Sequence, residues 1–301
     1  MQSEFTERRQ CINCKGAQLT KLSRGRYTDE PLLGFINGDP WGTNPLPYLA
    51  DAEWVFVQCQ DCSQLFHQRI LTAQWNEKRF SEWMSATAIE EFEKRIGNAA
   101  QRHFDKGRQH VEHALRIEKL TRSIRGKDEV VRVLDFGCGW GDFLVTCQQF
   151  GFDMSGVDRS AARRGGSRLP IYAELLEVRD RKPFHAITLF EVLEHLDSPA
   201  DTLSMLMPYL APGGVVILET PDCSGVNDIR TIKDYRAIHP LEHINAFTPE
   251  TLRSIGERSG LRCIPRGVAH VTADIVRVIK TSTKHAVWRD GLSTRLYFLK
   301  S

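Results

Sequence analysis

Apolar residues in the second part of the chain come in short continuous runs of strand length. Residues 215–218 form one such run, and mostly apolar stretches of similar length occur at 130–135, 262–264 and 295–299. Sequence with helical periodicity separates them, and strands that alternate with helices predict βαβ units and a mainly parallel sheet. We therefore predict an α/β fold over residues 127–301, with a doubly wound, mainly parallel seven-stranded sheet whose last two strands form an antiparallel pair.

Capping residues mark several helix ends in the same part of the chain. The helical pattern over 142–150 is followed by Gly151, which suits a left-handed C-cap. Ser198 is a good N-cap residue and Pro199 suits a first helical position. Thr248 precedes a proline in the same way. These signals predict one helix end and two helix starts.

The first part of the chain has a different character. Residues 1–70 hold a cluster of prolines and glycines and little helical periodicity, which predicts a compact module held together by a bound ligand. An insertion over 31–47 is expected to loop out of it. Residues 71–126 are charged and carry apolar residues at helical spacing, which predicts a helical connector or lid of two or three amphipathic helices.

Four of the eight cysteines form two Cys-x-x-Cys pairs, Cys11 with Cys14 and Cys59 with Cys62. Four thiolates at this spacing suit a tetrahedral structural zinc site, and the spacing favours a metal over disulfides in a cytosolic protein. Because all four positions would be filled by the protein, zinc would stabilise the fold and not catalyse. His67 is a spare ligand that we expect to be unused.

Composition narrows the class of protein. Of the 301 residues, 41% are hydrophobic and 26% charged, which is typical of a globular protein. Forty Lys and Arg against 38 Asp and Glu give a net charge of +2, too small to imply a nucleic-acid partner. The apolar runs are too short for a membrane helix, and the N-terminus lacks the apolar core of a secretory signal. We expect a cytoplasmic protein; the oligomeric state is not predicted.

A glycine-rich turn is the sharpest motif. Gly137, Gly139 and Gly141 follow a predicted strand and precede a predicted helix, and Asp158 closes the next strand 19 residues beyond Gly139. Glycines let the backbone approach a ligand closely, while a carboxylate at the tip of the second strand accepts hydrogen bonds from both ribose hydroxyls. The alternative is a tight turn without a ligand, but the matching acid favours nucleoside binding.

A dinucleotide fingerprint would have glycine where this chain has Asp142. An acid at the start of that helix would repel a phosphate. S-adenosylmethionine carries a ribose and an amino-acid end but no phosphate, so it fits this arrangement better than NAD does.

At this point the chain resembles the class I S-adenosylmethionine-dependent methyltransferases. The resemblance extends from about residue 130 to 300 and rests on four motifs in the expected order. They are Leu-Asp-Phe-Gly-Cys-Gly-Trp-Gly at 134–141, Gly-Val-Asp at 156–158, the run from Phe to Leu at 184–196, and Leu-Ala-Pro-Gly-Gly at 210–214.

The resemblance implies a cofactor site. Asp135 and the glycines would hold the methionine end, Asp158 the ribose, and Glu174 the adenine amine. Aromatic and acidic residues after the fourth strand would line the pocket. The full implied set is Asp135, Gly137, Cys138, Gly139, Gly141, Asp158, Glu174, Phe190 and Glu191.

Methyl transfer needs a base only when the acceptor must lose a proton. His195 follows the fourth predicted strand, and Glu242 with His243 lies in a loop after the fifth. Glu242 would orient or charge-tune His243 as a general base. The alternative is that these histidines are hydrogen-bonded structural groups.

The zinc module, the connector and this Glu-His pair together resemble the zinc-containing C-methyltransferases that act on nucleotide-linked deoxysugars. Glu242 and His243 match that family's Glu-His and His195 its histidine after strand four, but Pro240 and Leu241 stand where the family has a tyrosine. The leading hypothesis is methylation of carbon or oxygen on a sugar or other small biosynthetic intermediate. An RNA methyltransferase and a noncatalytic cofactor-binding module are the alternatives, and the mild charge disfavours RNA.

Overall fold

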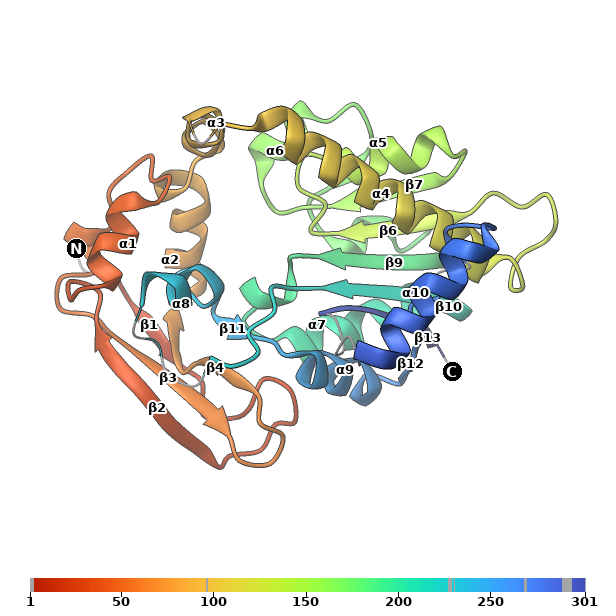
Figure 1. Ribbon diagram of the computed structural model, residues 1–301. Coiled ribbons are helices and arrows are strands. Elements are labelled where there is room, and N and C mark those ends of the chain that lie inside the picture. Colours follow the sequence, from red (N-terminus) through yellow and green to blue (C-terminus); the bar gives the residue numbers. More distant parts are fainter. Residues whose placement is uncertain are drawn as a thin grey trace. The chain divides into compact units, whose positions relative to one another are not determined.

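The computed structural model describes residues 3–95, 97–226, 229, 231–267, 270–288 and 294–300 (Figure 1). The chain folds into two compact units, each made from several segments. Unit 1 consists of Met1–Ala99, Glu194–Pro199 and Pro221–Thr251. Unit 2 consists of Ala100–Leu193, Ala200–Thr220 and Leu252–Ser301.

Unit 2 is built on a seven-stranded sheet in the order β12-β13-β10-β9-β6-β7-β8. The strands are β6 (Arg132–Phe136), β7 (Asp153–Val157), β8 (Ile171–Tyr172), β9 (Phe184–Phe190), β10 (Leu210–Glu219), β12 (Leu261–Ile264) and β13 (Arg295–Lys300). Neighbouring strands from β10 to β8 run parallel, whereas β13 is antiparallel to both β10 and β12. The predicted sheet and its antiparallel last pair are confirmed.

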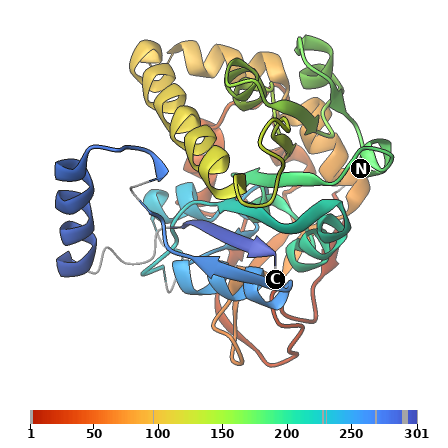
Figure 2. The ribbon, with the colours of Figure 1, turned by 90° about the vertical axis from the view of Figure 1, so that its right-hand side faces the viewer.

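Both faces of this sheet are buried. The helices of this part of the chain are α4 (Ala99–Thr121), α5 (Asp142–Gln149), α6 (Ala161–Gly166), η3 (Leu175–Val178), α7 (Pro199–Leu206), η5 (Met207–Tyr209), α9 (Pro249–Arg258) and α10 (Ile275–Trp288). Val133 and Ala186 share a core cluster with Ala114 of α4 and Phe143 of α5. The alternate strand residues, such as Leu134, are also fully buried, as a doubly wound fold requires. In Figure 2, helix α10 stands apart from the strands.

The predicted helix ends are found close to their expected positions. Helix α5 ends at Gln149, and Gly151 just beyond it has a φ of 78°. Helix α7 begins at Pro199. Helix α9 begins at Pro249, and the Thr248 hydroxyl accepts a hydrogen bond from the Thr251 amide at 3.3 Å. Local capping chemistry therefore determines these boundaries.

Unit 1 holds a four-stranded sheet in the order β11-β4-β3-β2 and a two-stranded sheet of β1 and β5. The strands are β1 (Phe5–Glu7), β2 (Leu19–Arg26), β3 (Glu53–Cys59), β4 (Leu65–His67), β5 (Arg69–Leu71) and β11 (Asn245–Ala246). The helices are α1 (Leu32–Gly38), η1 (Leu46–Tyr48), α2 (Ala73–Lys78), the π-helix η2 (Arg79–Trp83), α3 (Ala86–Arg95), η4 (Leu193–His195) and α8 (Ile232–Ala237). The connector is helical, as predicted.

The expectation that residues 31–47 loop out is wrong. Helix α1 buries Leu32 and Ile36 in the same core cluster as Tyr235 and Ile238 from α8 and its C-terminal end. The apolar side chains of Leu32 and Ile36 lie four residues apart, so one turn of helix presents both to the core. This burial outweighs the turn-forming tendency of the surrounding prolines and glycines.

Two late segments of the chain complete unit 1. Strand β11 pairs with β4, and α8 contributes to the unit 1 core. The domain boundaries predicted near residues 70 and 126 are statements about which segments fold independently, and they stay a prediction.

No helix among the described residues combines the length and apolar character needed to span a membrane.

Candidate functional site

The glycine loop of unit 2 follows β6 and leads into α5. Gly137, Gly139 and Gly141 all have positive φ values, of 75°, 58° and 83°. A Cβ on Gly137 would lie 2.5 Å from a methyl carbon of Val192, whereas a Cβ on Gly139 would meet nothing within 4 Å. The loop is therefore tightly packed at its start and leaves open space at Gly139, where a ligand can approach the backbone.

Asp158 lies directly after β7, which pairs in parallel with β6. One of its carboxylate oxygens accepts a hydrogen bond from the Gly139 amide at 2.9 Å and the other from the Ser160 amide at 2.8 Å. These bonds fix the carboxylate against the loop, and each oxygen keeps lone-pair capacity for a further donor. The geometry suits acceptance of two ribose hydroxyls.

Asp135 lies near the carboxyl end of β6 and is 3% exposed. Its carboxylate accepts a hydrogen bond from the Thr188 hydroxyl at 2.6 Å. Burial raises the pKa of Asp135 to about 7, against the opposing effect of that hydrogen bond. Nearby Asp158 also raises it. Two acids at one edge of the sheet favour a cationic ligand group, such as an ammonium or a sulfonium, over a phosphate.

Asp142 opens α5, where we expected it to repel phosphate. Its carboxylate pairs with the Lys106 ammonium at 2.7 Å. The lysine offsets part of that negative charge. The Arg163 guanidinium lies 3.7 Å from the Asp158 carboxylate in a similar way, so the case against a phosphate ligand rests mainly on the buried Asp135.

The other residues of the implied cofactor site have defined surroundings. The Cys138 side chain packs toward Gly156, while its amide donates to the Val157 carbonyl and its carbonyl accepts from the Gly141 amide. Glu174 is exposed and caps η3. The Phe190 ring stacks on His113 at 4.5 Å, and Glu191 adopts a φ of 55° directly after β9. A positive φ at a non-glycine residue is typical of functional sites.

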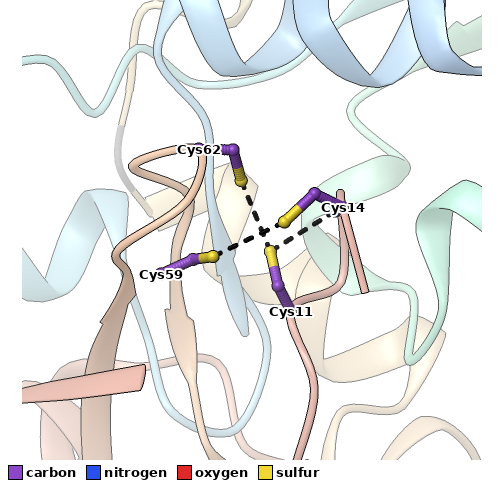
Figure 3. Close-up of side chains that lie close together, drawn as sticks. All are labelled: Cys11, Cys14, Cys59 and Cys62. Carbon is purple, nitrogen blue, oxygen red and sulfur yellow. Dashed lines mark hydrogen bonds between the residues drawn. The ribbon is translucent and has the colours of Figure 1, made fainter. Parts of the chain in front are cut away.

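In unit 1, the four sulfur atoms of Cys11, Cys14, Cys59 and Cys62 converge (Figure 3). The Cys11 and Cys62 sulfurs lie 3.5 Å apart, as do those of Cys14 and Cys59, and all four are within 4.8 Å of one another. Zinc–sulfur bonds of about 2.3 Å at tetrahedral angles place sulfurs roughly 3.8 Å apart. The residues fit such an ion.

Burial raises the pKa of Cys11 to about 11, so without a cation this thiol stays protonated at neutral pH. A metal ion would favour the thiolate. His67 is fully buried beside the rings of Trp54 and Phe56, and it is not among the residues that converge on this site. Its role as a ligand stays untested.

A second polar cluster in unit 1 contains His195, His243 and Glu194. One polar atom of each lies within 4.8 Å of the others, and the two imidazole rings meet edge-on with centroids 4.9 Å apart. His195 Nδ1 lies 3.0 Å from the Glu242 carbonyl oxygen and His243 Nδ1 lies 3.2 Å from that of Ala237. Because carbonyls only accept, both Nδ1 atoms carry the proton, which leaves each Nε2 unprotonated in the neutral ring.

Burial lowers the pKa of both histidines below the ordinary value, and their mutual proximity lowers that of His195 further. Both rings are therefore neutral at pH 7 and have a nitrogen able to accept a proton.

Glu242 does not hold His243 through a hydrogen bond among the contacts described. Its carboxylate instead pairs with the Arg79 guanidinium at 2.8 Å. Burial favours the protonated acid, but Arg79 and the nearby histidines together outweigh it and keep the pKa of Glu242 below its usual value. The charge of Glu242 in turn raises the pKa of His243, so the charge-tuning part of the expected role fits the geometry better than the orienting part.

Sequence reasoning missed Arg79 and Arg8. Arg79 is 1% exposed, and its only sequence signal is its place among aromatic residues of the connector. Arg8 is also buried, and nothing in the sequence separates it from the exposed Arg9 beside it.

The sheet order, the glycine loop and the two acids define the class predicted from the sequence, that of the methyltransferases. A family model described as "Methyltransferase domain" matches residues 108–265, just over half of the chain. The chain belongs to this family.

Named relatives agree with this family. A ubiquinone biosynthesis O-methyltransferase of Caulobacter sp. (strain K31) is 35% identical over 105 residues, which cover 31% of this chain and 41% of that protein. A protein of the same description from Paraburkholderia phymatum is 29% identical over 180 residues, 54% of this chain and 73% of the relative. The chain spans about half the length, or less, of most of these O-methyltransferase relatives.

Among solved structures, the plantazolicin methyltransferase BpumL, determined with a monoazolic desmethylPZN analogue and SAH, aligns with 75% of this chain and 94% of its own. The sequence identity is 15% and the TM-score 0.46.

Replacing Asp158 with Asn should weaken S-adenosylmethionine binding at least about tenfold, because charge-assisted hydrogen bonds are worth about 1.5–3 kcal/mol each. Isothermal titration calorimetry measures this. Asp153→Asn is the matched control, since Asp153 lies at the opposite end of the same strand and pairs with Arg181. Equal affinity in Asp158→Asn and the control would contradict the ribose assignment.

Affinity for S-adenosylmethionine should rise with pH around the pKa of Asp135, because only the ionised carboxylate attracts a cationic ligand. With a pKa of about 7, the gain between pH 6 and 8 approaches about tenfold if only the ionised form binds. Asp135→Asn should remove this pH dependence. A profile that is equally steep in wild type and Asp135→Asn would show that another group is responsible.

Proposed function

We propose that this protein is an S-adenosylmethionine-dependent methyltransferase that acts on a small biosynthetic intermediate. The observation that supports the cofactor best is the pair of buried acids, Asp135 and Asp158, beside the open backbone at Gly139. S-adenosylmethionine, when bound, supplies a methyl group by in-line displacement at its sulfonium.

Each part of the cofactor has a residue suited to it. The Asp158 carboxylate accepts hydrogen bonds from the ribose hydroxyls. The Asp135 carboxylate attracts the positively charged groups at the methionine end, which are the ammonium and the sulfonium. The backbone of the loop at Gly137, Gly139 and Gly141 lies close to the ligand, and Cys138 shapes this loop through its hydrogen bonds to Val157 and Gly141. Glu174 is proposed for the adenine amine, with Phe190 and Glu191 beside the cofactor.

The two histidines serve the acceptor. His243 takes the proton from the acceptor atom as that atom bonds to the methyl carbon and the carbon–sulfur bond breaks. His195, whose ring also keeps an unprotonated nitrogen, lies beside it. Glu242, held ionised by Arg79, stabilises the imidazolium that forms.

We further propose that the four cysteines hold a structural Zn²⁺ and that the acceptor is sugar-like. The sulfur positions fit a tetrahedral ion with no open position for catalysis. The resemblance to zinc-containing sugar methyltransferases supports a sugar acceptor, while the named relatives are O-methyltransferases and support an oxygen atom. Methylation of a carbon or of a hydroxyl oxygen requires removal of a proton from that atom, and the histidines would accept this proton.

The test of this function is incubation with S-adenosylmethionine labelled in the methyl group, together with cell metabolites or, separately, with RNA. Label should appear in small hydroxylated molecules, and mass spectrometry would identify them. Label in RNA alone would overturn the proposal, and cofactor binding without any transfer would favour a noncatalytic module.

His243→Ala should lower kcat by about 100-fold or more, as expected for loss of a general base, while leaving S-adenosylmethionine affinity unchanged. The matched control is His103→Ala, because His103 is exposed on α4. Kinetics with the identified acceptor and calorimetry with the cofactor measure both effects. Loss of cofactor binding in His243→Ala would remove His243 from the proposed role.

A further inference from the structure

Arg8 lies near the start of the chain, and its guanidinium donates to three separate segments of unit 1. It bonds to the His67 carbonyl in β4, to the Ile244 carbonyl at 2.9 Å and to the Asn245 side-chain oxygen at 2.7 Å. A longer contact of 3.3 Å reaches the Asp197 carbonyl. A single buried side chain thus joins the N-terminal strands to two segments found about 190 and 240 residues later.

These late segments are the ones that carry the histidines. His243 is followed directly by Ile244 and Asn245, and His195 by Leu196. The Asn245 amide donates to the Leu196 carbonyl at 2.7 Å while its oxygen accepts from Arg8. Arg8 and Asn245 therefore connect the residues next to each histidine.

Other side chains of the N-terminal part bond to the same region. Asn13, inside the first cysteine pair, donates to the Thr251 carbonyl at 3.1 Å. Gln64, two residues after the second pair, donates to the Ala246 carbonyl at 2.7 Å. The loops that carry the four cysteines thus bracket the segment that begins at Ile244, and Arg8 precedes Cys11 by only three residues.

A guanidinium suits this position in a way that other side chains do not. It presents five N–H groups in one rigid plane, so it can bond to several acceptors at once. Lysine offers the charge but not the planar fork, and methionine offers only the volume. The Ile244 carbonyl also accepts from the His67 amide at 2.9 Å, so loss of Arg8 would not leave that carbonyl unpaired. It would remove the side chain that joins this carbonyl to the Asn245 side-chain oxygen and to the Asp197 carbonyl, and so loosen both histidine segments.

We propose that Arg8 is a positioning residue that sets the orientation of His195 and His243 together. Its part in methyl transfer rests on the function proposed above, but the orientation itself does not. Nδ1 of each ring is held by a backbone carbonyl, of Glu242 for His195 and of Ala237 for His243. Arg8 fixes the chain beside both rings, and so preserves the tautomer in which each Nε2 is free to accept a proton.

The test is ¹⁵N nuclear magnetic resonance of the histidine rings, which distinguishes Nδ1-protonated from Nε2-protonated imidazole. In the full chain loaded with zinc, His195 and His243 should both show the Nδ1-protonated form. Arg8→Met should lose this preference in both rings, and Arg8→Lys should restore it only in part. Arg9→Met is the matched control, since Arg9 is the exposed neighbour, and it should leave both rings unchanged.

A purely structural role predicts a different pattern. Arg8→Met would then lower the unfolding temperature and keep both tautomers in the folded protein, which would overturn the proposal. Metal content and S-adenosylmethionine affinity should stay at wild-type values in the same sample. Turnover, with the identified acceptor, should fall through kcat by about 100-fold, the usual cost of misplacing a reacting group by about an ångström.

Asn245→Asp gives a second test that does not depend on Arg8→Met folding. It keeps an oxygen for Arg8 but loses the amide that donates to the Leu196 carbonyl. The His195 signal should change while that of His243 stays. Equal change in both rings, or none in either, would contradict the connection described.

The ring signals separate this inference from the proposed function. If no acceptor is ever methylated but Arg8→Met still changes both tautomers, the positioning role stands and the function fails. If methylation occurs and the tautomers are insensitive to Arg8, the function stands and the positioning role fails.

Discussion

Hydrogen bonds between the first 70 residues and two much later segments are the constraint on which unit 1 depends. Strand β11 completes a sheet whose other strands lie in those first residues, and Arg8, Asn13 and Gln64 bond to the backbone around it. A metal ion on the four cysteines, as proposed, would stiffen the loops that carry Asn13 and Gln64. Without these contacts, the residues next to His195 and His243 would lose their main partners in the unit.

In unit 2, two carboxylates are held at the edge of a buried sheet. Asp135 is held by Thr188, and Asp158 by two backbone amides. Burial makes ionisation of Asp135 costly, so a cationic ligand gains from neutralising it. The same arrangement disfavours a phosphate, which explains in physical terms why this loop differs from a dinucleotide-binding one.

Much of unit 2 was predictable from the sequence because its signals are local. The apolar runs, the capping residues and the glycine loop followed by Asp158 each lie within a short window, and the family match confirms the class that they indicate. The spacing of the four cysteines likewise predicts that they lie together, and their sulfur atoms converge. Whether the predicted site residues perform their assigned roles is still a prediction.

Long-range pairings could not be predicted. Arg79 meets Glu242 across 163 positions, and Arg8 meets Asn245 across 237. No periodicity links residues so far apart, so the sequence suggests a pairing of Glu242 with its neighbour His243, whereas the Glu242 carboxylate bonds to Arg79. The 31–47 segment was misjudged for a related reason: its turn-forming composition is local, whereas the core that buries Leu32 includes Tyr235 from far along the chain.

Hydrogen–deuterium exchange before and after removal of the metal tests the central claim most directly, namely that the N-terminal cysteine centre and its hydrogen bonds hold the histidine segments. We expect the amides of β4 and of residues 242–247 to exchange faster once the metal is gone, while those of β6 and β9 in unit 2 stay protected. Unchanged exchange at residues 242–247 after confirmed metal loss would contradict the account.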